Sequence, residues 1–184
     1  TGGNEFMATR RTFIKVLGGG AALLMTPAEK LAGLSLPGED PTTFAVVRGS
    51  DPAAAVRKAV DMLGGMGSFV KTGDVVFVKP NISWDRRPEQ AATTNPAVVE
   101  TVVAMVREAG ASRIIVADNA CNEARRTYKT SGIREAAEKA GAEVPFMEKR
   151  KFRMMNLGGE VMKDWEVYTE AIEADKIINL PVAK

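Results

Sequence analysis

Short apolar runs rich in valine and isoleucine alternate with proline-capped helical segments, and this alternation constrains the fold more than any other feature. Residues 75–78 and 114–117 are continuous apolar runs, which are typical of parallel strands covered on both faces. Between them, Asn95-Pro96 predicts a helix start, because Asn caps a helix and Pro fits its first turn. The alternation therefore predicts an α/β fold, with a mostly parallel, Rossmann-like sheet flanked by helices in three layers.

The same patterns predict the other elements of the body. These are strands at 44–48, 144–147 and 176–180, a helix between Asp51-Pro52 and Gly64-Gly65, a helix at 133–140, an inserted β-hairpin at 152–167, and a helical turn at 168–174. There is no internal repeat, so we expect residues 44–184 to form one α/β domain.

The N-terminal segment has the composition of an export signal rather than of a folded element. Residues 1–6 precede a methionine and have no periodicity, so we interpret them as a cloning remnant or linker. Arg10-Arg11, followed by Phe13 and Lys15, precedes a glycine-diluted apolar stretch that is too short to span a bilayer, since a span needs about 20 residues. This layout, and the run TRRTFIK in particular, resembles the bacterial twin-arginine translocation signal.

That resemblance implies export by the twin-arginine machinery to the periplasm or the outer face of the cytoplasmic membrane, with no stable membrane span. The signal would occupy residues 7–35 and a linker residues 36–43. An ordinary amphipathic helix is the alternative, but Gly18-Gly19-Gly20 would cost it about 1 kcal/mol per residue. Because this machinery carries proteins that are already folded, often around a cofactor, the resemblance also favours a cofactor.

Composition excludes several kinds of chemistry for this chain. A net charge of +2 gives no reason to expect nucleic acid as a partner. The absence of histidine removes Ser-His-Asp and Cys-His nucleophiles and every His-ligated metal site. The single cysteine excludes an intrachain disulfide and any four-cysteine cluster ligand set within this chain.

Polar residues follow the predicted strands where each strand ends. Lys79 and Asn81 follow the second strand, Asp118 and Asn119 the third, and Lys184 the last. Because ligands of open α/β sheets bind outside the carboxyl ends of the strands, we expect these side chains to form one site for a carboxylate or phosphate. Lys79 and Asp118 are the candidate catalytic residues, and Asp118 is also a candidate metal ligand. The alternative is a strand-end ion pair between Lys79 and Asp118 beside turn-forming asparagines.

Other charged and reactive residues near these loops are weaker candidates. Arg86-Arg87 and Arg125-Arg126 could clamp an anion, but solvated surface arginines are the simpler interpretation. Cys121 lies three residues after Asp118 and is more simply interpreted as a small residue than as a nucleophile.

Four segments of the body resemble a bacterial and archaeal family known as domain of unknown function 362. They are VVFVKPNISW, ATTNPAVVETVVAMVREAGA, IIVADNA and EADKIINLPVAK, in the order seen in that family. The resemblance marks Lys79, Pro80, Asn81, Thr94, Asn95, Pro96, Asp118, Asp175, Asn179, Pro181 and Lys184, and so adds Thr94, Asn95 and Asn179 to the candidate ligand-binding residues.

The resemblance implies an α/β protein, sometimes exported and sometimes associated with iron–sulfur motifs. In the family the sequence usually continues past the position of Lys184, so we expect this chain to be part of a larger domain. Two functions follow as expectations. One is an exported enzyme, dependent on a metal ion or iron–sulfur cluster and possessing a redox partner, that acts on an anionic small molecule; the other is a non-catalytic periplasmic binding or assembly module for an anionic ligand or partner protein.

Overall fold

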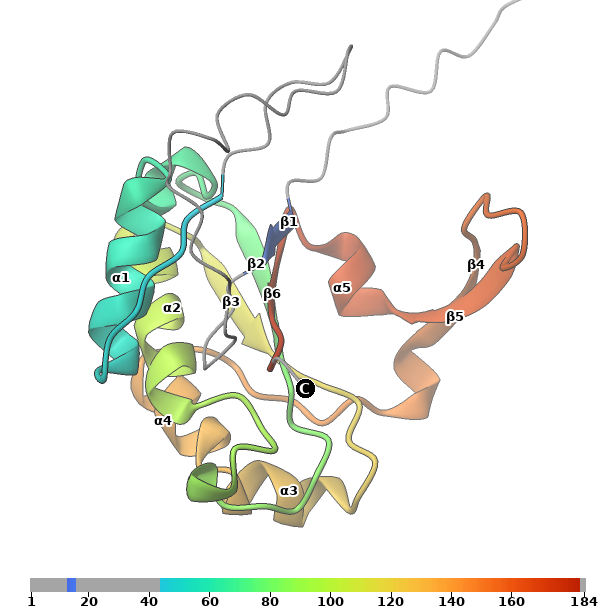
Figure 1. Cartoon of the computed structure of the whole chain (residues 1–184). Coiled ribbons are helices and arrows are strands. Elements are labelled where there is room, and N and C mark those ends of the chain that lie inside the picture. Colours follow the sequence, from blue (N-terminus) through green and yellow to red (C-terminus); the bar gives the residue numbers. More distant parts are fainter. Residues whose placement is uncertain (1–12, 16–43, 183–184) are drawn as a thin grey trace, which may run out of the picture.

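The computed structural model describes residues 13–15 and 44–182 (Figure 1). The strands are β1 (Phe13–Lys15), β2 (Val75–Pro80), β3 (Arg113–Val116), β4 (Phe152–Asn156), β5 (Asp164–Tyr168) and β6 (Lys176–Leu180). The helices are α1 (Pro52–Met62), α2 (Pro96–Glu108), α3 (Ala124–Thr130), α4 (Ile133–Lys139) and α5 (Thr169–Glu173), with 3-10 turns at Met66–Ser68, Pro88–Gln90 and Lys149–Lys151.

The central sheet is parallel and has the strand order β1-β6-β2-β3. Phe77 of β2 pairs with Ile115 of β3 on one side and with Ile177 of β6 on the other. From β2 the chain passes through α2 to β3, and it returns through α3, α4, the β4–β5 hairpin and α5 to β6. The predicted α/β class, parallel sheet and inserted hairpin are therefore confirmed.

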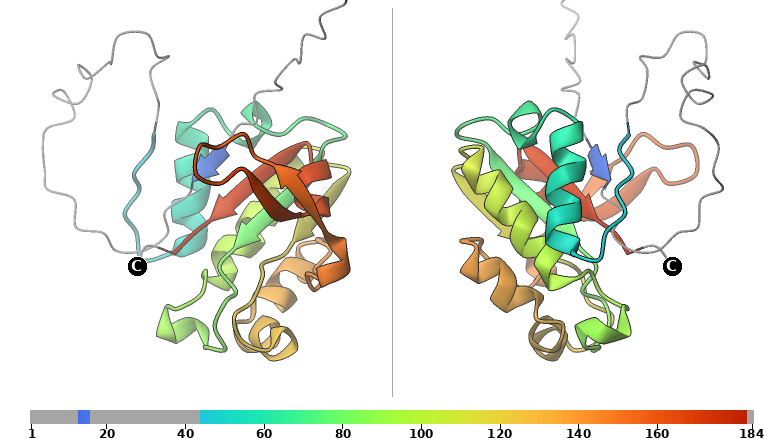
Figure 2. Two further views of the ribbon diagram at one scale, coloured as in Figure 1. Left: turned by 90° about the vertical axis from the view of Figure 1, so that its right-hand side faces the viewer. Right: turned by 60° about the vertical axis from the view of Figure 1, so that its left-hand side comes forward.

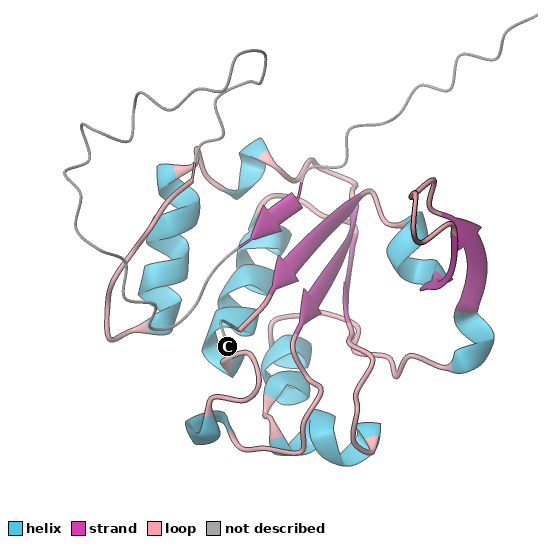
Figure 3. Ribbon diagram, turned by 45° about the vertical axis from the view of Figure 1, so that its right-hand side comes forward, coloured by secondary structure: helices cyan, strands magenta, loops and turns pink. Residues whose placement is uncertain are grey.

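Helices cover one face of the sheet, and the hairpin base with α5 covers part of the other (Figure 3). On the helical face, Val78, Val116 and Ile178 pack with the buried valines of α2, which gives the main hydrophobic core. On the opposite face, Phe77 and Ile115 pack with Tyr168 and Ala174. This alternation follows from the strand geometry, because successive side chains point to opposite faces.

Both predicted helix starts are confirmed by their cap geometry. The Asp51 carboxylate accepts hydrogen bonds from the backbone N–H groups of Ala53 and Ala54. The Asn95 side chain likewise accepts the Ala97 N–H at 2.9 Å. After α1, Gly64 and Gly65 have φ values of +93° and +78°, a left-handed conformation that ends the helix.

Two predicted strands are wrong. Residues 44–48 form no strand, and Phe44 and Val46 remain exposed because this run lies beside no sheet edge. Residues 144–147 also form no strand; only Glu143 makes a single bridge to Ile115, and Pro145, which has no N–H, interrupts further pairing.

Helix α3 was not expected from the sequence. Only Thr127 and Tyr128 are buried in its seven residues, so it has no recurring apolar stripe. The last predicted elements agree with the structure: the hairpin lies at β4–β5, the helical turn at α5 and the final strand at β6. No helix in the described part of the chain has both the length and the apolar character needed to cross a membrane.

Candidate functional site at the carboxyl ends of the strands

The direction of chain progression reverses between β2 and β6, and this makes the gap between their carboxyl ends the switch point of the sheet. The chain leaves β2 for β3 on one side and comes back to β6 on the other side. At such a reversal the loops that follow the two strands run in opposite directions and leave a crevice between them. Ligands of α/β sheets bind in this crevice. Lys79 and Asn179 form a register pair at this point.

Lys79 and Asp118 form an ion pair at the end of the sheet. Lys79 Nζ lies 2.9 Å from Asp118 Oδ1 and also donates to the Pro80 carbonyl at 3.3 Å. The Asp118 side chain is 5% exposed, whereas that of Lys79 is 41% exposed. A buried carboxylate therefore holds a lysine whose charged end still reaches solvent.

The second oxygen of Asp118 is bound by the loop that follows β2. Asp118 Oδ2 accepts the Ile82 N–H at 2.8 Å and the Ser83 hydroxyl at 3.3 Å. With Lys79 on Oδ1, both carboxylate oxygens are engaged. These contacts satisfy a buried charge, which would otherwise be costly.

Tyr128 of α3 holds the backbone of Asp118. Its hydroxyl donates to the Asp118 carbonyl at 2.7 Å and accepts the Asp118 N–H at 2.9 Å. The ring packs against Phe146, with 5.2 Å between ring centroids. Burial raises the pKa of Tyr128 to about 12. Sequence reasoning missed this residue, and its only signal was an aromatic side chain among the polar residues after Asp118.

Thr94 joins the loop after β2 to the end of β6. Its hydroxyl accepts the Asn81 N–H at 2.8 Å and donates to the Leu180 carbonyl at 2.7 Å. The Asn81 side chain in turn accepts the Val182 N–H at 2.9 Å. Thr94 and Asn81 thus stabilise the arrangement of the strand ends, and their predicted contact with a ligand stays a prediction.

Asn95 and Asn119 lie at the same edge but have different environments. Asn95 caps α2, as described above, and the preceding Thr94 places this helix N-terminus against the ends of β2 and β6. The 13-residue helix directs the positive end of its dipole to this edge. Asn119 is exposed, so its role as a ligand-binding residue is still a prediction.

Among the predicted ligand-binding residues, Asn179 has a side-chain oxygen without a hydrogen bond from the described residues. Its Oδ1 atom is buried and accepts no hydrogen bond from the described residues. Its register partner is Lys79, so both side chains lie on the same face of the sheet. A buried amide oxygen that accepts no hydrogen bond is unusual, because nearly all buried polar groups in proteins have a hydrogen-bond partner.

The described residues do not fit a metal ion or an iron–sulfur cluster. Within residues 44–182, no three His, Cys, Asp or Glu side chains gather in a way that could hold a metal. Asp118 stands next to Lys79, a cation, and Cys121 is an isolated, exposed thiol. We therefore assign no role to a metal at Asp118.

A second network joins the loops after β2 and β3. The Ser83 carbonyl accepts the N–H groups of Cys121 and Asn122, and the Asn122 side chain accepts the Asp85 N–H at 3.0 Å. Arg126 pairs with Asp85 at 2.8 Å. Arg126, a weak candidate for an anion clamp, is thus already bound to a carboxylate.

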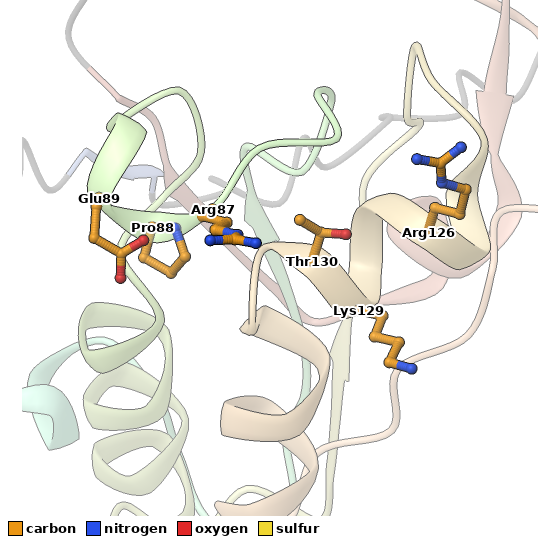
Figure 4. Close-up of a pocket in the computed structure, with 6 residues that line it drawn as sticks. All are labelled: Arg87, Pro88, Glu89, Arg126, Lys129 and Thr130. Carbon is orange, nitrogen blue, oxygen red and sulfur yellow. The ribbon is translucent and has the colours of Figure 1, made fainter.

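An open hollow lies between the loop after β2 and helix α3 (Figure 4). Arg87 and Thr130 both line this hollow, and the side chains of Arg126 and Lys129 point in different directions in this view. The basic side chains do not converge on one point, so the hollow is a weaker candidate for binding a small anion than the switch point. Its lining is Arg87, Pro88, Glu89, Arg126, Lys129 and Thr130.

Some predicted residues lie outside the described part of the chain. They are Lys184 at the candidate site and Arg10 and Arg11 of the export signal. Phe13 and Lys15 of that signal belong to β1, whose backbone pairs with β6. This pairing does not test export.

A protein-family model matches the part of the chain that contains the candidate site. Residues 76–184 match the family described as Domain of unknown function (DUF362). The thylakoid-associated protein sll1697 of Synechocystis sp. (strain ATCC 27184 / PCC 6803 / Kazusa) is 34% identical over 137 residues, which cover 71% of this chain and 40% of that protein. The chain thus corresponds to about two-fifths of that relative's length. No solved structure matches the chain.

Proposed function

Because the chain belongs to the DUF362 family, whose function is unknown, we propose a function from its own geometry: it binds a small anionic molecule at the switch point through Lys79. The observation that carries the proposal is the Lys79–Asp118 pair. A buried carboxylate fixes the position of an ammonium group that remains partly open to solvent. The ligand class is a carboxylate or a phosphate.

The bonding of Lys79 leaves room for a ligand. An ammonium group has three N–H donors, and Lys79 directs them to only two acceptors among the described residues, Asp118 and the Pro80 carbonyl. The remaining donor is available to an anion. The positive end of α2 adds to the attraction, because helix N-termini favour negative charge.

Asn179 supports a more specific ligand. Its buried Oδ1 needs a hydrogen-bond donor, which a simple carboxylate lacks. Oδ1 is closed to solvent in this structure, so a hydroxyl group next to the acid group supplies that donor only when binding displaces what covers Oδ1, while the acid group binds Lys79. We therefore favour a hydroxylated acid over its deoxy analogue.

Asp118 acts in this proposal as a positioning residue. Lys79, the Ile82 N–H and the Ser83 hydroxyl already occupy its oxygens, so it is poorly arranged to accept a proton from a substrate. The described residues thus favour binding over acid–base catalysis.

The binding test compares two lysine variants of the full chain by calorimetry or ligand-observed NMR, with acetate, glycolate and inorganic phosphate as probes. Lys79→Gln removes the charge, and Lys58→Gln, on an exposed position of α1, is the control. We expect Lys79→Gln to weaken binding by about tenfold or more, because a charge-assisted hydrogen bond is lost. Equal binding by both variants, or no binding of any probe by the wild-type protein, would contradict the proposal.

A third variant tests the hydroxyl preference. Asn179→Leu keeps a similar side-chain volume and removes the acceptor. The wild-type protein should prefer glycolate to acetate, and Asn179→Leu should bind the two alike. A glycolate preference that survives this substitution would contradict the role of Asn179 and leave that of Lys79 standing.

Export is a separate part of the proposal and rests on the sequence of residues 7–35. The relative named as thylakoid-associated is consistent with a location at or near a membrane. Replacing both Arg10 and Arg11 by Lys should keep the full chain in the cytoplasm of a bacterial host, whereas Lys15→Arg should not. Equal recovery of both variants in the periplasmic fraction would contradict export by the twin-arginine machinery.

A further inference from the structure

The β4–β5 hairpin exposes a group of apolar side chains, here called the hairpin patch. Five of the nine large hydrophobic side chains exposed in the described residues lie on it, and Val161 is 100% exposed. Figure 1 and the right-hand view in Figure 2 show the tip of the hairpin standing away from the central sheet. Apolar groups gathered in this way mark interaction surfaces. The hairpin patch consists of Met154, Leu157, Val161, Met162 and Trp165.

Among the described residues, the contacts between the hairpin and the sheet lie at the hairpin base. The Phe152 and Tyr168 rings lie 5.4 Å apart, and the Tyr168 ring lies 6.1 Å from that of Phe77 in the sheet. Beyond this base the hairpin is a two-stranded sheet, and such a sheet is marginally stable unless further strands or a packed face support it. A further strand would therefore stabilise the hairpin.

The outer edge of β4 can accept that strand. The Leu157 N–H donates to the Lys163 carbonyl, so Leu157 directs its backbone groups to the opposite side of the hairpin. Backbone direction alternates along a strand, and Phe152, Met154 and Asn156 therefore direct their N–H and carbonyl groups outward. In the described part of the chain, no strand pairs with this edge.

We propose that two copies of this chain associate through their β4 strands, which pair antiparallel about a two-fold axis at Met154. This register uses the whole strand. Met154 lies opposite the partner's Met154, Phe152 opposite Asn156, and Arg153 opposite Met155, with the outward backbone groups hydrogen-bonded across the axis. The two hairpins become one four-stranded sheet, and the same β4 edge serves both copies, as two-fold symmetry requires.

Charge selects β4 over β5 for this pairing. The only charged side chain of β4 is Arg153, which meets an uncharged residue in the proposed register. The equivalent pairing of β5 would place Glu166 directly opposite itself, and like charges in that position are destabilising. Charged residues on an exposed edge oppose strand addition, so β5 is protected and β4 is not.

The test measures the oligomeric state of the full chain by sedimentation velocity over a range of concentrations. The wild-type protein should form a dimer. Met154→Lys places two like charges at the axis and should raise the dimer dissociation constant about tenfold or more. Met162→Lys makes the same change in the hairpin patch outside β4, and it should leave the dimer intact.

A covalent test covers the case in which Met154→Lys disturbs the hairpin itself. In a Cys121→Ser background, Met154→Cys should form an interchain disulfide under mild oxidation, because directly opposed residues lie within disulfide reach. Met162→Cys should not. A monomeric wild-type protein, equal effects of the two lysine variants, or equal cross-linking by the two cysteine variants would overturn the proposal.

Discussion

The Tyr128 hydroxyl binds both backbone groups of Asp118, its N–H at 2.9 Å and its carbonyl at 2.7 Å. One buried side chain thus holds the backbone of Asp118, two residues beyond the end of β3, from which the carboxylate reaches Lys79. Because the Lys79–Asp118 pair carries the proposed binding site, Tyr128 is a positioning residue for it.

Tyr128→Phe should lower the free energy of unfolding by about 1–3 kcal/mol, since it leaves two buried backbone groups without their partner. Tyr168→Phe is a matched control. Tyr168 is also buried, but its hydroxyl has no partner in hydrogen-bonding geometry among the described residues. Burial raises the pKa of Tyr168, and the nearby Lys151 ammonium group offsets only part of that rise. Urea unfolding measures both variants. An equal loss of unfolding free energy in Tyr128→Phe and Tyr168→Phe would show that the hydrogen bonds to Asp118 do not add to stability.

The raised pKa of Tyr128 predicts a loss of stability at high pH. The folded protein holds the phenol proton up to about pH 12, whereas the unfolded chain releases it near the ordinary value of 10.0. The stabilisation is therefore complete below about pH 10 and is lost as the pH rises toward 12. The predicted decrease is about 2–3 kcal/mol at the top of this window.

Urea unfolding of the wild-type protein and Tyr128→Phe between these pH values measures this decrease. The pKa of Tyr168 is also raised by burial, so Tyr168→Phe serves as a comparison. Tyr128→Phe should flatten the pH dependence more than Tyr168→Phe does. A steeper dependence in Tyr128→Phe than in the wild-type protein would contradict the assignment.

Adjacent buried threonines give a direct test of the contacts between strand ends. Thr94 bonds Asn81 and Leu180, whereas the Thr93 hydroxyl is buried without a partner among the described residues. Thr94→Val should cost about 1–3 kcal/mol of unfolding free energy, and Thr94→Ser should recover much of it. Thr93→Val should change stability by no more than about 0.5 kcal/mol or increase it. The reverse order of effects in thermal or urea unfolding would show that Thr94 does not join the strands.

Local sequence signals predicted the elements that depend on local physics. Asp51 and Asn95, each followed by proline, marked both long helices, because capping needs only neighbouring residues. The apolar runs of β2 and β3 were equally clear, since strands covered on both faces need apolar side chains throughout.

Elements that depend on distant partners were not predicted correctly. Residues 44–48 have strand-like composition but no sheet edge to pair with, and only the tertiary structure shows this. Helix α3 forms around Tyr128, whose burial depends on Phe146 and Asp118. A tyrosine that organises a site through backbone contacts leaves no spacing pattern in the sequence.

Sequence reasoning predicted the candidate site only in part, because some of its contacts also depend on residues that are distant in the sequence. The strand-end ion pair between Lys79 and Asp118, given above as the alternative to a ligand site, is present, and ligand binding by these residues stays a prediction. The rule that ligands bind at strand ends gave no indication that Thr94 and Asn81 would use their side chains to join the loops, because those bonds need β6 beside β2.

Acetylation of Lys79 by a limiting amount of acetic anhydride, followed by mass spectrometry with and without a bound anion, shows whether an anion binds the Lys79 ammonium group. Glycolate or phosphate should slow acetylation of Lys79 and leave Lys58 on α1 unchanged, because the anion occupies the free donor of the Lys79 ammonium group. Equal rates at Lys79 with and without either anion, at concentrations that saturate binding, would contradict a site built on the Lys79–Asp118 pair.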